Sequence, residues 1–337
     1  MNTRRDFLKQ AGVAGAGLAM GGGAAQAAHS PSYKGAPTMP HNLKLLAIHH
    51  PDGTETLGAV VKGGVIDIRA TASKLGIHAP LTLDDMLQNG DADSLARVVA
   101  GAAHSGVPLL AEADVKHGKL FAKPGKIICV GLNYRQHAKE IGMPEPRVPP
   151  LFNKYNNALA GQHCSITLPP ADVSVKFDYE TELLIVIGKT CRNVNEGEAL
   201  DYVAGYCTAN DFSARDLQLE LPAGQWMIGK TLDNFAPIGP YFVSADLVGD
   251  PNALKLQTWV NGELRQSSNT SDFIFNTQQI IAYISKHWTL EPGDIIFTGT
   301  PQGVIAGKPK DQQVWLKAGD EVVSSIEKLG ELRFKLA

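Results

Sequence analysis

The chain has 337 residues, of which 44% are hydrophobic and 19% are charged, a composition typical of globular proteins. Its formal net charge is only −3 and it contains no run of basic residues, so the sequence predicts no nucleic-acid partner. After residue 28 no apolar run is long enough to span a bilayer, and we expect no stable membrane insertion of that part of the chain.

Residues 1–28 have the features of an export signal. Arg4-Arg5 is a twin-arginine pair, an apolar stretch rich in Ala and Gly follows, and Ala25-Gln26-Ala27 offers the small residues that a signal peptidase reads. We therefore expect a twin-arginine signal peptide, recognition by the twin-arginine export machinery and a periplasmic location. The alternative is a flexible Gly/Ala-rich tail. Residues 29–42, rich in Pro, His, Ser and Gly, are predicted to be a linker.

Residues 43–122 are predicted to form a small α+β domain. Short apolar runs separated by turns that contain glycine predict strands at Leu45–His49, Leu57–Val61 and Val65–Ile68. Helical spacing of apolar residues predicts helices at Leu81–Leu87 and Leu95–Ala102, the second with Asp93 as a candidate cap. This region has no cluster of titratable residues, so we expect it to cover or support the main domain.

Residues 123–337 are predicted to form the main domain, in which strands outnumber helices. The expected strands are Ile127–Val130, Phe177–Ile187, Tyr202–Asn210, Leu254–Val260, Glu263–Gln266, Ile295–Thr298, Glu321–Glu327 and Glu331–Leu336. A helix capped by Asn276 is expected at Thr277–His287, and Asn261-Gly262 is a strong hairpin signal. Because helices do not alternate regularly with strands, the pattern favours an α+β fold with a mixed, mostly antiparallel sheet over a doubly wound one.

Two glutamates in the strand predicted at Phe177–Ile187 are candidate metal ligands. Side chains alternate along a strand, so Glu180 and Glu182 point to the same face, and the apolar second half of the strand indicates burial. Two neighbouring carboxylates on one buried face repel each other and are poorly solvated, so they need a counter-charge, which a hard divalent cation supplies. The alternative is an edge strand whose glutamates face water. Asp211, after the next apolar strand, is either a third ligand or a helix cap.

A second candidate pair lies in the segment Gly131–Glu140. His137 and Glu140 are three residues apart, so in a helix they share a face and can form a hydrogen bond. A glutamate beside an imidazole selects its tautomer and raises its basicity, which a general base needs near neutral pH. The alternative is an ordinary polar pair on a surface helix.

Six motifs in this order resemble the C-terminal domain of the fumarylacetoacetate hydrolase family. They are G-L-N-Y-x-x-H-x-x-E from Gly131, P-L-F-N-K from Pro150, D-Y-E-T-E-L from Asp178, N-D-F-S-A-R-D-x-Q from Asn210, G-K-x-x-D-x-F-x-P-x-G-P from Gly229 and T-G-T-P from Thr298. The resemblance covers roughly residues 124–337, and it implies a β-sandwich or roll of this family's type and a homodimer.

The resemblance also implies the roles of nine residues. It implies that Glu180, Glu182 and Asp211 bind one Mg²⁺ or Mn²⁺ per subunit, and that His137 and Glu140 activate water. The residues that it implies contact the substrate are Arg215, Gln218, Lys230 and Thr300. One departure concerns the substrate: after P-L-F-N-K the family usually has a small hydroxyl residue, and here the segment reads Tyr155-Asn156-Asn157-Ala158.

The implied activity is metal-dependent hydrolysis of a C–C bond in a diketo acid or acylpyruvate-type 2-oxo acid, with a metal-stabilised enolate and water activated by His137 and Glu140. Decarboxylation, lyase chemistry or isomerisation of a 2-oxo or ureido acid on the same site is the alternative within the family. A periplasmic protein that binds a metal or ligand without catalysis is the alternative from another class, although such a protein has no need of a base.

Overall fold

The computed structural model describes residues 38–221 and 225–337. The predicted signal peptide, residues 1–28, and residues 29–37 of the predicted linker lie outside the described residues. Among the helices of the described residues, none is long and apolar enough to cross a membrane.

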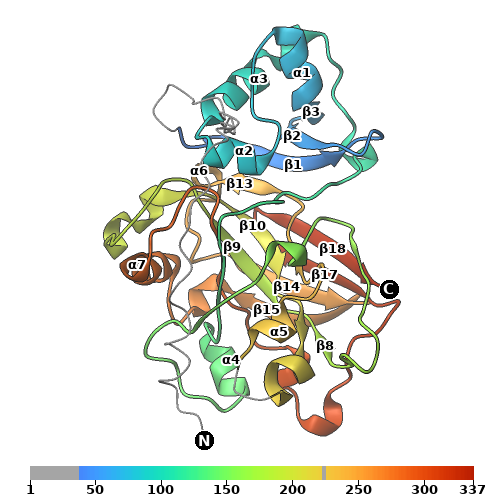
Figure 1. Ribbon diagram of the computed structural model, residues 1–337, viewed down its shortest axis with the longest axis vertical. Helices are drawn as coiled ribbons and strands as arrows, with labels where there is room; N and C mark the ends of the chain where they lie inside the picture. The colour runs from blue at the N-terminus through green and yellow to red at the C-terminus, as the bar shows by residue number, and fades with distance from the viewer. Residues whose placement is uncertain (1–37, 222–224) are drawn as a thin grey trace, which may run out of the picture. The chain divides into compact units, whose positions relative to one another are not determined.

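The larger of the two main sheets in the described residues has nine strands, in the order β3-β2-β1-β13-β10-β9-β16-β4-β5 (Figure 1). Its neighbouring strands are antiparallel except for β16 and β4, which are parallel. The strands are β1 (Lys44–His49), β2 (Glu55–Val61), β3 (Gly64–Asp67), β4 (Ile127–Val130), β5 (Leu151–Asn153), β9 (Thr181–Ile187), β10 (Val203–Asn210), β13 (Phe242–Ser244) and β16 (Ile295–Phe297).

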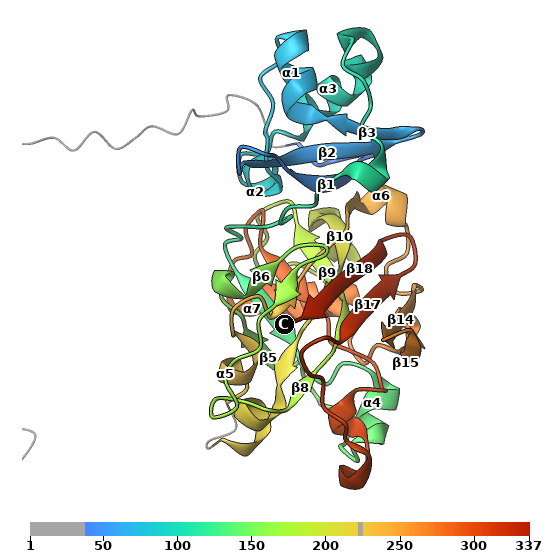
Figure 2. The same cartoon turned by 90° about the vertical axis from the view of Figure 1, so that its right-hand side faces the viewer.

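The second sheet has five described strands, in the order β15-β14-β17-β18-β7 (Figure 2). They are β7 (Ser165–Ile166), β14 (Lys255–Val260), β15 (Glu263–Asn269), β17 (Glu321–Ile326) and β18 (Gly330–Leu336). Two short pairs complete the strands: β6 (Leu159–Ala160) with β12 (Ala236–Pro237), and β8 (Phe177–Asp178) with β11 (Ser213–Ala214). The two large sheets pack through one apolar cluster, to which β9 contributes Leu183 and β14 contributes Leu256. The mixed, mostly antiparallel α+β fold predicted from the sequence is confirmed.

The helices are short and flank the sheets. They are α1 (Ile68–Leu75), α2 (Leu83–Gln88), α3 (Ala92–Ser105), α4 (Arg135–Glu140), α5 (Met227–Lys230), α6 (Ala245–Val248) and α7 (Thr277–His287). Short 3₁₀ or π turns lie at η2 (Glu112–Asp114), η3 (Asn156–Ala158), η4 (Glu196–Tyr202), η5 (Asp216–Glu220), η7 (Thr270–Asp272), η8 (Ile305–Gly307) and η9 (Lys310–Gln312). The prediction of α7 is confirmed with its cap, because Asn276 and Gln279 form a reciprocal capping box.

One helix was missed by the sequence predictions, and the start and cap of another need correction. Helix α1 was not predicted, because its buried positions include Thr71 and Ala72, and small or hydroxyl residues produce only a weak apolar period. Helix α3 begins at Ala92 instead of Leu95, and its cap is Asp91, whose side chain accepts a hydrogen bond from the backbone N–H of Ser94.

The larger sheet crosses the boundary that the sequence predicts near residue 122. Strand β1 pairs with β13, so β1–β3 extend the sheet that also contains β9 and β10. One apolar cluster includes Leu45 of β1, Leu184 of β9 and Phe242 of β13. The division into residues 43–122 and 123–337 therefore remains a prediction about folding units, because the sheet hydrogen bonds are continuous across it.

The long strand predicted at Phe177–Ile187 is divided. Strand β8 pairs with β11, whereas β9 pairs with β10 and β16, and Tyr179-Glu180 lies between them. The backbone of Glu180 has its own partners: its N–H donates to Asn210 Oδ1 at 3.1 Å, and its carbonyl accepts from the N–H of Asp211 at 2.8 Å. These contacts end the regular strand, and they connect Glu180 directly to the last residue of β10 and to the residue after it.

Candidate active site

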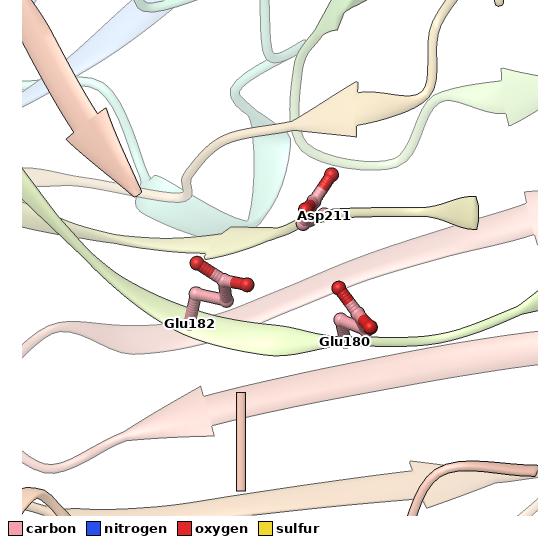
Figure 3. Close-up of side chains that lie close together, drawn as sticks. All are labelled: Glu180, Glu182 and Asp211. Carbon is pink, nitrogen blue, oxygen red and sulfur yellow. The ribbon is translucent and has the colours of Figure 1, made fainter. Parts of the chain in front are cut away.

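Three buried carboxylates converge where β9 begins and β10 ends. Glu180 immediately precedes β9, Glu182 is its second residue, and Asp211 follows the last residue of β10. Antiparallel pairing of Ala209 with Glu182 places the end of β10 beside the start of β9. Glu180 and Glu182 project from the same side of their strand, and Asp211 comes from the neighbouring strand (Figure 3). One ligand atom from each lies within 4.8 Å of the others.

Glu182 is the carboxylate that most needs a cation. Its side chain is 2% exposed and forms no ion pair within the described residues; its Oε2 accepts a hydrogen bond from the backbone N–H of Gly299 at 2.7 Å. Burial, followed by the negative charges of Asp211 and Glu180, raises the pKa of Glu182 well above its usual value. A divalent cation would reverse that balance, since it attracts all three carboxylates.

The other two carboxylates are balanced by basic side chains. Lys230 Nζ lies 2.5 Å from Glu180 Oε2 and 2.8 Å from Asp211 Oδ2, and Arg215 Nη2 lies 2.7 Å from Glu180 Oε1. Burial alone would raise the pKa of Glu180, but Arg215 and Lys230 outweigh it and hold the pKa at about 2. Glu180 is therefore ionised and available as a ligand at neutral pH.

Two further buried charges, which the sequence analysis assigned no role, complete the site. Lys154, directly after β5, has its Nζ 2.6 Å from Asp211 Oδ1, and it also donates to the carbonyl oxygens of Phe212 and Lys230. Asp178 accepts hydrogen bonds from Arg215 Nε and from the loop that follows β16. Both lie within two of the six motifs, P-L-F-N-K and D-Y-E-T-E-L, and their places in these motifs were the available signal.

The charges of the site leave room for a cation. Four buried carboxylates, of Asp178, Glu180, Glu182 and Asp211, oppose three basic side chains, of Lys154, Arg215 and Lys230, so one negative charge is in excess when all are ionised. Carboxylate oxygens are the ligands that Mg²⁺ and Mn²⁺ prefer. A divalent cation would make the site net positive, which suits an acidic substrate. The residues therefore fit the metal that the sequence predicts.

The structure brings His137 and Glu140 together on α4. His137 Nδ1 lies 3.0 Å from Glu140 Oε2, and because an ionised carboxylate only accepts, the imidazole donates from Nδ1. Its Nε2 is then the nitrogen that can take up a proton. Both side chains are largely buried, with 12% and 22% exposure. The predicted helical pair is confirmed, and its role in catalysis stays a prediction.

One loop connects this pair with the carboxylates. In residues 298–307, the backbone N–H of Gly299 donates to Glu182 and that of Gly303 donates to Glu140 Oε1 at 2.9 Å. The N–H groups of Ile305 and Ala306 both donate to Asp178. Gly299 and Gly303 have φ of 95° and 99°, which residues with a Cβ rarely adopt.

The four residues predicted to contact substrate are all buried at this site, but they differ in the atoms they leave for a ligand. Arg215 contacts Asp178 and Glu180, and its Nη1 donates to Gln218 Oε1 at 2.8 Å. Thr300 donates its hydroxyl hydrogen to the Thr181 carbonyl at 3.0 Å, so it can only accept from a substrate. For Lys230, the hydrogen-bond partners among the described residues are Glu180 and Asp211, which leaves one ammonium hydrogen for a substrate oxygen.

The segment in which the chain departs from the family pattern lies against α5. Tyr155 is half exposed; its N–H donates to Thr231 Oγ1 at 3.0 Å and its hydroxyl lies 3.1 Å from the sulfur of Met227. Asn157 Nδ2 donates to the carbonyl of Thr231 and to Asp233 Oδ1. The unusual residues therefore pack beside the helix that carries Lys230.

The fold and the site place the protein among α+β enzymes that carry a group of carboxylates where two antiparallel strands meet. The model of the fumarylacetoacetate (FAA) hydrolase C-terminal family matches residues 126–337, and the chain belongs to this family.

The chain is 42% identical over 268 residues to the protein named oxaloacetate tautomerase FAHD2B, mitochondrial, from Bos taurus, covering 80% of this chain and 82% of that one. Among solved structures it resembles the fumarylacetoacetate hydrolase of Exiguobacterium antarcticum, with a TM-score of 0.71, 32% identity, and coverage of 87% of this chain and 99% of that one. It also resembles the maleylpyruvate hydrolase of Sphingobium sp. SYK-6 in complex with manganese(II) and pyruvate, with a TM-score of 0.69, 29% identity, and coverage of 88% and 98%.

The periplasmic location predicted from the first residues is wrong. The bovine relative that matches 80% of the chain is named as a mitochondrial protein, and the comparisons give no sign of export. Arginines followed by small and apolar residues are features of targeting segments for more than one compartment, so this pattern does not identify the compartment. The twin-arginine segment itself lies outside the described residues.

Proposed function

We propose that this protein is a metal-dependent tautomerase that interconverts the keto and enol forms of a 2-oxo dicarboxylic acid of the oxaloacetate type. The observation that carries the proposal is the buried Glu182, which completes a group of three carboxylates without an ion-pair partner of its own in the described residues. The 42% identity to a relative named oxaloacetate tautomerase supports this reaction above hydrolysis, which the sequence motifs favoured.

In the proposed site Glu180, Glu182 and Asp211 hold one Mg²⁺ or Mn²⁺. When bound, the cation would supply Lewis-acid stabilisation of the negative charge that develops on the substrate's 2-oxo oxygen. Lys230, with one ammonium hydrogen left, would bind an oxygen of the substrate carboxylate, and Arg215 would add positive charge beside it.

His137 would transfer the proton. Its Nε2 would take a proton from the carbon next to the 2-oxo group, and the resulting imidazolium would return a proton to the 2-oxo oxygen to form the enol. Glu140 keeps the hydrogen on Nδ1 and stabilises the imidazolium that results, because its carboxylate lies 3.0 Å away. The reaction needs no water and releases no fragment, so the same groups catalyse both directions.

Hydrolysis of a C–C bond in an acylpyruvate is the second candidate. The His137–Glu140 pair favours it, because the same Nε2 could deprotonate a water molecule that attacks the distal carbonyl. The structural relative named maleylpyruvate hydrolase supports this alternative. The two reactions differ in outcome, since hydrolysis produces two carboxylic acids from one substrate and tautomerisation produces an isomer.

Enol loss from freshly dissolved enol-oxaloacetate, followed by ultraviolet absorbance with Mn²⁺, with Mg²⁺ and with chelator, tests the proposal. We expect a metal-dependent rate that falls by about 10²–10⁴ in His137→Ala, the usual contribution of a general base. His104→Ala, an exposed histidine at the end of α3, is the matched control and should retain the parent rate.

A panel of acylpyruvates assayed in parallel separates the two candidates. Metal-dependent formation of pyruvate from a panel member, with no acceleration of enol loss from oxaloacetate, would replace the tautomerase proposal with the hydrolase. No metal-dependent turnover of either kind of substrate would refute both.

A further inference from the structure

Strand β15 has one fully buried side chain, and it is polar. The other residues of this edge strand are exposed or half-buried, but Gln266 is 1% exposed. Its Nε2 donates to Thr300 Oγ1 and to the Pro301 carbonyl, both at 2.9 Å, and its Oε1 accepts from Thr258 Oγ1 at 2.6 Å and from the Thr181 N–H at 3.2 Å. A side-chain amide can form four such bonds, so the hydrogen-bonding capacity of Gln266 is fully used.

Gln266 belongs to a polar row that crosses the five-stranded sheet. Thr258 of β14 pairs with Gln266 of β15 on one side and with Ser324 of β17 on the other. Thr181 Oγ1, at the start of β9, lies 2.5 Å from Thr258 Oγ1 and 2.6 Å from Ser324 Oγ. All four side chains are buried, and their hydrogen bonds join the two large sheets.

The residue that this row contacts lies between two of the candidate metal ligands. Thr181 separates Glu180 from Glu182, and its side chain points to the opposite face from theirs. Its N–H is bonded by Gln266 and its carbonyl by Thr300, which Gln266 also holds. Both peptide groups around Thr181 are therefore fixed, and with them the directions in which the two carboxylates project.

The same row also reaches the third carboxylate. Asn210 precedes Asp211; its Nδ2 donates to Ser324 Oγ at 3.1 Å and its Oδ1 accepts from the N–H of Glu180 at the same distance. Because these groups are buried, water does not compete for their hydrogen bonds. Each fully hydrogen-bonded side chain of the row therefore restrains the orientation of the next one.

We propose that Gln266 is a positioning residue for the metal centre: through Thr181 and Thr300 it sets the relative directions of Glu180 and Glu182. The inference rests on the proposed metal centre formed by these carboxylates and Asp211. A ligand that points in the wrong direction weakens metal binding. Loss of a group that orients the ligands typically lowers metal affinity by about 10-fold to 100-fold. Gln266→Leu keeps the size of the side chain but removes all four bonds.

Mn²⁺ affinity of the full chain, measured by calorimetry and by electron paramagnetic resonance of free Mn²⁺, tests the proposal, and thermal unfolding with chelator is recorded for every variant. We expect Gln266→Leu to raise the Kd for Mn²⁺ at least about tenfold. Gln257→Leu is the matched control, since Gln257 is half-buried on β14, one residue before Thr258 and on the other face of the same sheet. Val260→Ala removes buried apolar volume from the same strand without touching the row and controls for general destabilisation.

A Kd raised tenfold in Gln266→Leu, with both controls within twofold of the parent, would support the positioning role. A folded Gln266→Leu protein that binds Mn²⁺ within twofold of the parent would overturn it and leave the metal centre intact, as would an equal loss in Val260→Ala. If the parent itself bound no Mn²⁺, the metal centre and the positioning role would both fall.

Thr258→Val tests the row if Gln266→Leu does not fold. Valine has the shape of threonine, so this change removes only the hydroxyl that contacts Gln266 and Thr181. We expect the Kd for Mn²⁺ to rise about threefold or more. This rise is smaller than the roughly tenfold rise expected for Gln266→Leu, because Thr258 acts on the ligands less directly. An unchanged Kd in this variant would overturn the proposal.

Discussion

Replacing Glu182 with glutamine should have opposite effects on metal binding and on the stability of the metal-free protein. The side chain is 2% exposed, and its pKa is raised well above the usual value by burial and by the charges of Asp211 and Glu180. Glutamine has nearly the same shape and can still accept the hydrogen bond from Gly299, but it carries no charge. The variant therefore loses a metal ligand and is also relieved of an unfavourable buried charge.

The expected magnitudes follow from linkage. At a Mn²⁺ concentration 100 times the Kd, binding stabilises the parent by about 2.7 kcal/mol. For a protein of this size, about 2 °C in Tm corresponds to each kcal/mol, so Mn²⁺ should raise the Tm by about 5 °C. In Glu182→Gln the rise should be absent. With chelator at pH 8, ionisation of the buried Glu182 carboxyl costs the parent stability because its pKa is raised on folding, so the metal-free variant should unfold at a higher temperature than the metal-free parent.

The pH dependence provides a further check on the sign. A carboxyl group whose pKa is raised on folding is favoured in its protonated form. Its destabilisation of the folded protein is therefore absent below the pKa of the unfolded state, about 4.3, and grows as the pH rises toward the pKa of the folded state. The stability advantage of the metal-free variant should therefore be largest at pH 8 and shrink toward pH 5. Differential scanning fluorimetry at several pH values measures it. A variant that keeps the Mn²⁺ shift, or that is no more stable than the parent at pH 8, would refute the reasoning.

Three further predictions concern neighbouring groups. His137→Ala should leave the Kd for Mn²⁺ within about twofold of the parent while turnover falls, because the imidazole is not in the carboxylate group; calorimetry beside the enol assay shows this, and lost metal binding would contradict it. Arg215→Met leaves the Asp178 and Glu180 carboxylates without their guanidinium, so we expect a loss of about 3–5 kcal/mol in urea unfolding, and an unchanged midpoint would count against these ion pairs. Asn276→Ala removes the cap of α7 and should cost about 1 kcal/mol in the same experiment with kcat unchanged; a changed kcat would show that α7 influences the site.

Much of the local structure could be predicted because the interactions behind it are short in sequence. The capping box of α7 involves Asn276 and Gln279, three residues apart, and the hairpin at Asn261-Gly262 needs only the positive φ of both residues. The His137–Glu140 contact also depends on one helical turn. Each of these follows from backbone geometry that a few neighbouring residues determine.

The division between β8 and β9 could not be predicted in this way. Apolar alternation from Phe177 to Ile187 is continuous, but the partners that interrupt the strand at Glu180 are Asn210, the last residue of β10, and Asp211, which follows it. For the same reason the pattern of Glu180 and Glu182 was compatible with a solvated edge until β10 and β16 were seen to cover both edges of β9.

The sequence by itself determined the fold class, the local motifs, the carboxylates and the histidine–glutamate pair as candidates, because residue type and spacing encode hydrogen bonds within a turn or a strand. Only the tertiary structure decided which charges meet. Lys154 reaches Asp211 across 57 positions, Gly299 reaches Glu182 across 117, and Gln266 reaches Thr181 across 85. Such contacts depend on how two sheets pack, which is the sum of many apolar contacts and leaves no short pattern in the chain.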